Sequence, residues 1–186
     1  SHTDDTRSQP DFWVEDLERG TVFPVLKSLN PDLGAIWSPD GRQLAFVTGH
    51  LPLRWGELNL NIVAADGTGI VRSLNCPGDY CEPSDWQADG TLLLTVLESG
   101  NWNVWTISAD GSGSAKPLLT ADFSERDPRY SPNGGWIAYV SEEAGRPEVL
   151  VHSVASPARR FVVPGEGGAQ PVWRRDGKSL YFVDLQ

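Results

Sequence analysis

Short apolar runs recur along the chain, and each is entered through a polar tight turn. The runs are Leu44–Val47, Leu92–Leu94, Trp136–Val140 and Leu180–Val183. Each turn is a five-residue segment that opens with Trp or Tyr and ends in Asp-Gly or Asn-Gly: Trp37–Gly41, Trp86–Gly90, Tyr130–Gly134 and Trp173–Gly177. Asp-Gly and Asn-Gly pairs tolerate the positive φ of tight hairpin turns. The pattern therefore predicts four β-hairpins of short strands.

A second hairpin is predicted after each of the first three. Residues 58–64 alternate between apolar and polar side chains, turn at Asp66-Gly67 and continue at 70–74. The pairs 103–107 with 116–119 and 148–151 with 160–163 repeat this arrangement. No segment shows a sustained helical period. Four strands in a repeat of 43 to 49 residues are typical of a propeller blade, so we expect an all-β β-propeller of four-stranded antiparallel blades.

The positions at which the repeats begin and end predict how the chain is divided into a lead-in, half-blades and whole blades. We expect a disordered lead-in at residues 1–10 and a propeller over 11–186. The propeller should contain half-blades and whole blades at 11–26, 34–74, 84–119, 128–163 and 170–185. This is about four blades' worth of sequence, and pairing of the two terminal half-blades is one way to close the ring. The Trp or Tyr that opens each turn should pack between neighbouring blades.

Net charge and hydropathy argue against some classes of function. The chain of 186 residues has a net charge of −10, which argues against a nucleic-acid partner because phosphate binding needs a basic face. No apolar run approaches the roughly 20 residues that a membrane span requires. An acidic surface favours a protein or peptide partner of basic character.

Two cysteines flank a short turn at Cys76-Pro-Gly-Asp-Tyr-Cys81. The Pro-Gly pair can bring them within bridging distance, and a disulfide would suit a periplasmic or otherwise extracytoplasmic protein. The alternative is a pair of free thiols in a loop. A metal site is not expected, because two cysteines without nearby histidines supply half of a zinc shell.

Candidate binding residues lie in the longer connections. The tight turns should share one face of the propeller, and the connections between hairpins and between blades should share the other. Trp, Tyr and Arg are enriched at binding hot spots, and function gathers on such loops. The predicted binding face consists of Arg54, Trp55, Tyr80, Trp102, Arg126, Asp127 and Arg146. The alternative is that the tryptophans fold down onto blade edges.

Catalytic patterns are weak. Gly111-Ser-Gly-Ser114 has the wrong spacing for a nucleophile elbow, and the three histidines make no metal motif. Glu142 with Glu143, or Glu125 with Asp127, supplies a carboxylate pair, although any acidic loop does the same. We therefore predict no enzyme activity, no catalytic residue, no metal and no cofactor.

The repeats resemble those of TolB-like, WD-like β-propellers. The resemblance lies in Trp37-Ser-Pro-Asp-Gly with Leu44-Ala-Phe, in Ala65-Asp-Gly-Thr-Gly and in Pro128–Ser141, and it covers residues 11–185. The chain is also similar to propeller domains beside bacterial serine/threonine kinases and regulators. The resemblance implies protein–protein contact, as in the periplasmic TolB partner system, and it transfers no catalytic residues.

Two further functions stay open beside a protein- or peptide-binding module. One is an accessory or ligand-gating propeller of a hydrolase of the peptidase, lactonase or glycosidase type, and the other is the sensor domain of a bacterial kinase. TolB-like propellers usually have six blades, whereas this chain encodes about four. A monomer that closes on itself, a homodimer that completes a ring and a part of a longer propeller are therefore all compatible with the sequence.

Overall fold

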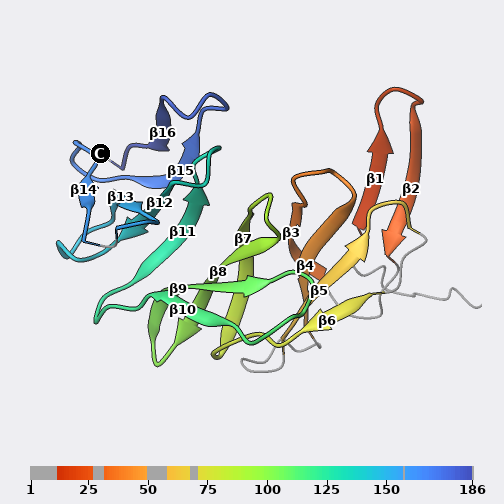
Figure 1. Ribbon diagram of the computed structural model, residues 1–186, viewed down its shortest axis with the longest axis horizontal. Coiled ribbons are helices and arrows are strands. Elements are labelled where there is room, and N and C mark those ends of the chain that lie inside the picture. Colours follow the sequence, from red (N-terminus) through yellow and green to blue (C-terminus); the bar gives the residue numbers. More distant parts are fainter. Residues whose placement is uncertain (1–11, 27–31, 50–57, 68–70, 157, 186) are drawn as a thin grey trace, which may run out of the picture.

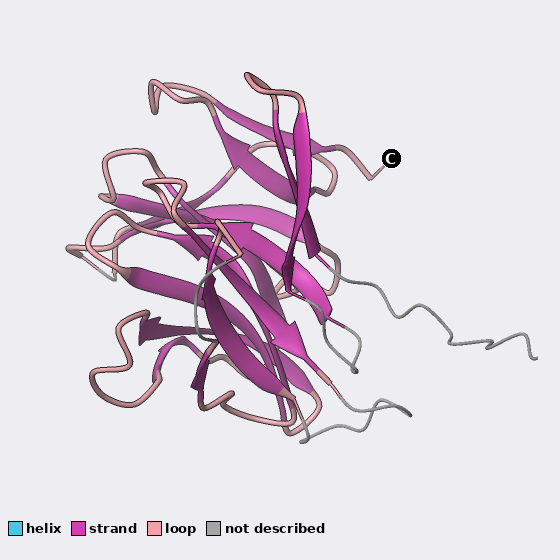
Figure 2. Ribbon diagram, turned by 90° about the vertical axis from the view of Figure 1, so that its right-hand side faces the viewer, coloured by secondary structure: helices cyan, strands magenta, loops and turns pink. Residues whose placement is uncertain are grey.

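The structure is a computed structural model, and it describes residues 12–26, 32–49, 58–67, 71–156 and 158–185. Every regular element within these ranges is a strand (Figure 2). The lead-in expected at residues 1–10 lies outside the described residues. The absence of helical periodicity in the sequence thus corresponds to an all-β architecture over the described ranges.

The described strands form five antiparallel sheets. The N-terminal half-blade consists of β1 (Phe12–Asp16) and β2 (Thr21–Leu26). Blade 1 consists of β3 (Asp32–Trp37), β4 (Gln43–Thr48), β5 (Asn59–Ala64) and β6 (Arg72–Leu74). Blade 2 consists of β7 (Tyr80–Trp86), β8 (Thr91–Glu98), β9 (Asn101–Ser108) and β10 (Lys116–Leu119).

Blade 3 and a second half-blade complete the order. Blade 3 consists of β11 (Glu125–Tyr130), β12 (Trp136–Ser141), β13 (Glu148–Ser153) and β14 (Arg160–Val162). The C-terminal half-blade consists of β15 (Ala169–Trp173) and β16 (Leu180–Val183). Each blade is an up-and-down sheet in chain order, which confirms the predicted propeller blades of four antiparallel strands. The inner strands begin a few residues before the expected bounds.

The sheets follow one another in an arc (Figure 1). The inner strands β3, β7, β11 and β15 contact one another in that order, so each blade stacks on the next through its inner edge. The two half-blades remain separate sheets and lie at opposite ends of the arc. Pairing of the half-blades within one chain is therefore not seen among the described residues.

The core lies between the sheets because each strand alternates its side chains between two neighbours. In β8, Leu92, Leu94 and Val96 pack with side chains of blade 1, whereas Leu93 packs with Ile137 of blade 3. All of these side chains are almost fully buried, and each contributes about 2 kcal/mol. A blade cannot bury both faces alone, so stacking is what stabilises the repeat.

The aromatic residue that opens each tight turn packs on the preceding sheet, with one exception. Trp86 is 8% exposed and lies in the core between blades 1 and 2, and the Trp173 indole N–H donates to the Arg129 carbonyl at 3.1 Å. Trp37 is 49% exposed. The expectation that all four aromatic residues pack between blades is thus wrong at Trp37, because the described residues include no inner hairpin in the half-blade before it.

The serine of the Ser-Pro-Asp-Gly turn organises its hairpin. The Ser38 hydroxyl donates to Asp40 Oδ1 at 2.6 Å and accepts the backbone N–H of Gln43 at 2.9 Å. In blade 3, Ser131 makes the same contacts with Asn133 and Trp136. These turn residues therefore satisfy their own backbone, as expected for structural rather than catalytic aspartates.

Three of the four inner strands carry a left-handed residue at the same place. Gly34, Asp127 and Gln170 have φ values of 63°, 54° and 52°, and each stands three residues before the aromatic residue of its turn. The strand register shifts at each of these points, as in a β-bulge. Pro83 occupies the corresponding position in β7, where its ring holds φ negative. Bulges therefore bend the inner edge on which the blades meet.

Candidate functional site

The face opposite the tight turns holds those predicted binding residues that the structure describes, and we call it the loop face. Arg54 and Trp55 lie outside the described residues. Tyr80 begins β7, and Trp102 is the second residue of β9. The remaining three residues, Arg126, Asp127 and Arg146, belong to blade 3, in β11 and in the connection before β13.

Tyr80 and Trp102 form an aromatic pair on blade 2. Their ring centroids are 5.7 Å apart and their planes meet at 88°, an edge-to-face contact. Both are opposite Leu97 in the strand register, so β7, β8 and β9 hold them on one side of the sheet. The Tyr80 hydroxyl donates to Glu82 Oε2 at 3.1 Å. Burial, with the Glu82 charge beside it, raises the pKa of Tyr80 to about 12, so its hydroxyl stays a donor.

The aromatic pair adjoins the connection that leads into blade 3. The Trp102 backbone N–H donates to Ser124 Oγ, and the Asn101 side-chain amide donates to the Asp122 carbonyl, both at 3.4 Å. The tryptophan is half-buried rather than fully exposed. Its ring packs against Tyr80 and is still partly accessible at the surface.

The two predicted binding arginines of blade 3, Arg126 and Arg146, already have partners within the chain. Arg126 pairs with Glu142, and Arg146 donates to Glu148 Oε1 at 2.9 and 3.1 Å. Arg146 also donates to the Glu166 carbonyl at 2.7 Å. These contacts join neighbouring strands and connections of the loop face. A partner that used either guanidinium would have to compete with these bonds.

A buried carboxyl lies where β11 begins. Glu125 is 4% exposed, and its Oε2 has no hydrogen-bond partner among the described residues. Burial raises the pKa of Glu125, and a hydrogen bond from the Ala121 backbone and the charge of Arg160 oppose this effect. The residue follows Ser124, so it lies directly behind the segment that Trp102 contacts. Sequence reasoning noted Glu125 as part of an acidic pair, but its burial depends on how the blades stack.

The side chains around Glu125 form a second charged group. Glu143 and Arg160 pair at 2.8 Å, and the hydrogen bond from Arg160 lowers the pKa of Glu143. Tyr139 is buried in the core between blades 2 and 3, and burial raises its pKa. Glu143 and Arg160 are 17 positions apart in the sequence, so no local pattern reveals their pairing.

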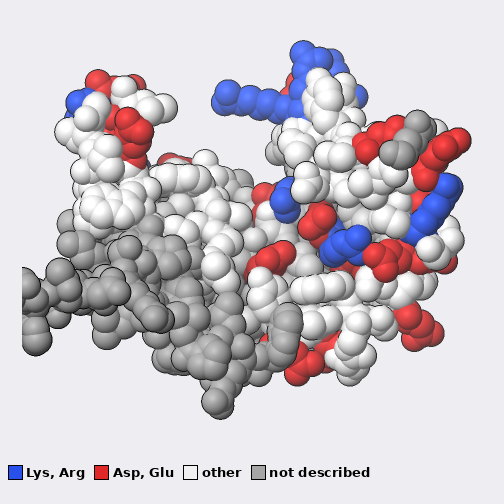
Figure 3. Space-filling view, turned by 180° about the vertical axis from the view of Figure 1, so that it is seen from behind, with Lys and Arg blue, Asp and Glu red and all other residues white. Residues whose placement is uncertain are grey.

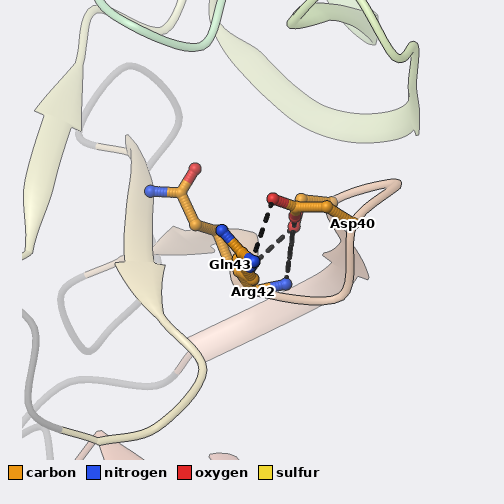
Figure 4. Close-up of polar contacts among 4 residues, drawn as sticks. Asp40, Arg42 and Gln43 are labelled. Carbon is orange, nitrogen blue, oxygen red and sulfur yellow. Dashed lines mark hydrogen bonds and ion pairs between the residues drawn. The ribbon is translucent and has the colours of Figure 1, made fainter.

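Cavities are found on the turn face, where binding was not predicted. One of about 830 Å³ lies between the N-terminal half-blade and blade 1, and its lining includes Trp37 and Asp40. Figure 4 shows the Asp40 carboxylate turned towards Arg42, with the Gln43 side chain pointing away. Hydrogen bonds from Ser38 and from the Arg42 backbone lower the pKa of Asp40. Asp40 thus stays charged at the cavity rim.

The two cysteines are joined in the structure. Cys76 and Cys81 form a disulfide with a Cα–Cα distance of 5.8 Å. Cys81 lies in the core between blades 1 and 2, and Cys76 packs against its edge. The bond therefore ties the connection before β7 to the inner strand of blade 2.

Among the described residues, no group of three or more His, Cys, Asp or Glu side chains is arranged to hold a metal ion. No helix within these ranges is long and apolar enough to span a membrane.

Sequence comparisons identify related proteins. The family model described as "TolB beta propeller domain" matches residues 3–186. The Tol-Pal system protein TolB of Polaromonas sp. is 29% identical over 185 residues, which cover 82% of this chain and 42% of that protein. The protein TolB homolog of Chlorobium luteolum is 32% identical over 135 residues, which cover 73% of this chain and 29% of that protein. The chain thus spans less than half the length of these curated relatives.

Solved structures with the same fold include both TolB and an enzyme. TolB from Acinetobacter baumannii aligns with a TM-score of 0.67 at 21% identity, over 91% of this chain and 42% of that one. An oligogalacturonate lyase in complex with manganese aligns with a TM-score of 0.72 at 13% identity, over 95% and 54% of the two chains. At such identities the likeness concerns the fold alone.

Proposed function

Because the chain belongs to the family of TolB β-propeller domains, we propose that it is a non-catalytic module that binds a protein or peptide on its loop face. The observation that carries the proposal is the edge-to-face pair of Tyr80 and Trp102, which stands at the junction of blades 2 and 3. Large aromatic residues at the centre of a surface are frequent binding hot spots. The names of the related proteins place them in the Tol-Pal system, which supports a protein partner.

The character of the partner follows from the surface around the aromatic pair. Glu82 and Glu142 adjoin predicted binding residues, and the chain as a whole carries a charge of −10. A basic segment with an apolar or aromatic side chain matches such a surface. Cation–π contact with the Trp102 ring would add to the attraction.

An extracytoplasmic location is part of the same proposal. The disulfide between Cys76 and Cys81 suits an oxidising compartment, and TolB proteins of the Tol-Pal system are the named relatives. We place the module in the periplasm. An accessory role beside a hydrolase or a kinase has weaker support, since the likeness to enzymes is a likeness of fold.

The proposal is tested by selecting basic and neutral peptides from a displayed library against the immobilised chain. Replacement of Trp102 by Ala should lower the affinity for the selected peptides about 30-fold, as expected for a hot-spot tryptophan. The matched control is Trp13→Ala, because Trp13 is exposed and lies on the N-terminal half-blade. Circular dichroism checks that both variants fold. Equal weakening by the two variants, or none by Trp102→Ala, would contradict a loop-face site.

A further inference from the structure

The cavity beside the N-terminal half-blade is suited to accept a β-hairpin. In blade 1, the outer pair β5–β6 stands beside an inner pair β3–β4, and β1–β2 precedes blade 1 as β5–β6 precedes blade 2. The N-terminal half-blade is therefore an outer pair. The cavity of about 830 Å³ is lined by Val14, Phe23 and the half-exposed Trp37. It lies where an inner hairpin would stand.

The C-terminal half-blade is such an inner hairpin with one open face. Trp173 and Phe182 point towards blade 3, where the Trp173 indole contacts Arg129 and the Phe182 ring approaches Gly168. The alternate residues Val172, Tyr181 and Val183 are 54%, 61% and 48% exposed. Three large apolar side chains thus share the face that a following blade would cover.

The charges of the two ends are opposite. The tip of the C-terminal half-blade carries Arg174, Arg175 and Lys178 beside Asp176, and Figure 3 shows Lys and Arg gathered over this tip. The cavity rim carries Asp16, Asp40 and Asp66 beside Arg42. Both sets belong to the turn face, so a hairpin seated in the cavity would bring its basic tip to the acidic rim.

We propose that the C-terminal half-blade of a second copy inserts into this cavity, so that its β16 pairs with β1 and a composite four-stranded blade forms. Tyr181 and Val183 would then join Val14 and Phe23 in covering blade 1. The Trp37 indole would donate to the Val172 carbonyl of the second copy, as the Trp173 indole donates to Arg129. The exchange is reciprocal and gives a closed two-fold dimer.

A second copy fits the geometry better than the chain's own hairpin. The two half-blades lie at opposite ends of the arc, so self-closure requires the blades to stack at a sharper angle (Figure 1). Pairing with a second copy fills the cavity without bringing the two ends of one arc together. The proposal concerns the ends of the arc and is separate from peptide binding on the loop face.

The experiment is light scattering behind a sizing column over a range of concentrations. We expect a species of twice the 20.3 kDa chain mass that dissociates on dilution. Arg175→Glu should weaken the dimer about tenfold by placing an acid at the acidic rim. Trp37→Ala should weaken it by about 30-fold through loss of a central aromatic contact. Trp37 is half-exposed, so the variant should still fold, as circular dichroism will show.

Two controls keep the test specific. Lys116→Glu makes the same change of charge on exposed β10 and should leave the dimer intact. Trp102→Ala should also leave it intact, which separates assembly from loop-face binding. A single-chain mass at every concentration would overturn the proposal, even if Trp37 were shielded by the chain's own hairpin. A dimer whose dissociation constant changes with neither Arg175→Glu nor Trp37→Ala would also overturn the proposal.

Discussion

The fold disfavours the ionised form of the Glu125 side chain. Its carboxyl is buried at the start of β11, and one oxygen accepts no hydrogen bond from the described residues. Burial raises its pKa in the folded protein above the ordinary value of 4.5. The proton is therefore held more tightly by the folded state than by the unfolded chain. The stability that protonation supplies is complete below the unfolded value and is lost as pH rises through the folded one.

Replacement of Glu125 by Gln should make this stability independent of pH. Gln keeps the shape and the carbonyl-type acceptor but cannot ionise. At pH 7 the variant should be more stable than the parent by about 1 kcal/mol, because burial penalises the ionised carboxylate but not the neutral amide. At about pH 4 the two proteins should be nearly equal, because the parent is then protonated. Urea unfolding at both pH values measures the difference, and a variant less stable at pH 7 would contradict the assignment.

Among the elements, the connection before β7 lies close against the backbone of β8. Gly78 lies within the disulfide loop at φ 70°, and the Asp79 N–H donates to the Leu97 carbonyl of β8 at 2.8 Å. A Cβ at Gly78 would stand 2.5 Å from that carbonyl oxygen and 2.8 Å from a methyl group of Val96. The loop is thus pressed against the sheet that it enters.

Gly78→Ala should therefore destabilise the protein much more than a comparable change elsewhere. Gly41, with φ 68° and no atom within 4 Å of its Cβ position, is the matched control. Gly41→Ala should cost about 1 kcal/mol from its left-handed backbone alone. Gly78→Ala adds a clash with backbone and should cost about 3 kcal/mol or more. Thermal and urea unfolding under oxidising conditions compare the two. Similar losses would show that the loop can move away from β8.

The strands could be predicted from the sequence because hairpin turns and alternation are local. Ser-Pro-Asp-Gly fixes a turn within five residues, and its chemistry recurs at Ser38 and Ser131. The bulges of the inner strands could not be predicted, since Gly34, Asp127 and Gln170 share a backbone conformation but no side-chain type. The position of an element in the stack is also not local. For this reason the exposure of Trp37 was missed.

In the candidate site, too, local features could be predicted from the sequence and contacts across strands could not. The sequence indicates only that Tyr80 and Trp102 lie in connections on one face, whereas the structure places them in β7 and β9. Their pairing depends on β8, which lies between these strands. Arg126 is a candidate binding residue by its type, and its partner Glu142 comes from the connection after the neighbouring strand. Residue type could thus predict the candidates. Which of them keep a free polar group depends on contacts across strands.

The whole molecule is an arc whose stability should decrease towards its ends. Blades 1 to 3 enclose the cores that contain the fully buried residues of β8 and β12, while each half-blade has one covered face. Two-stranded sheets are marginal without such packing. Local opening should therefore begin at the half-blades and reach the central blades last.

Hydrogen exchange should report this gradient and its dependence on concentration. In dilute protein, the amides of β1 and β16 should exchange at least tenfold faster than those of β8 and β12, because their hydrogen bonds open without disturbing the central cores. At high concentration a composite blade would protect β1 and β16 while leaving β8 unchanged, since only the former gain a neighbouring strand. Mass spectrometry of exchanged peptides at two concentrations distinguishes these cases. Equal protection along the chain would mean that the arc opens as one cooperative unit. Half-blade exchange that is fast at both concentrations would mean that each half-blade keeps its open edge.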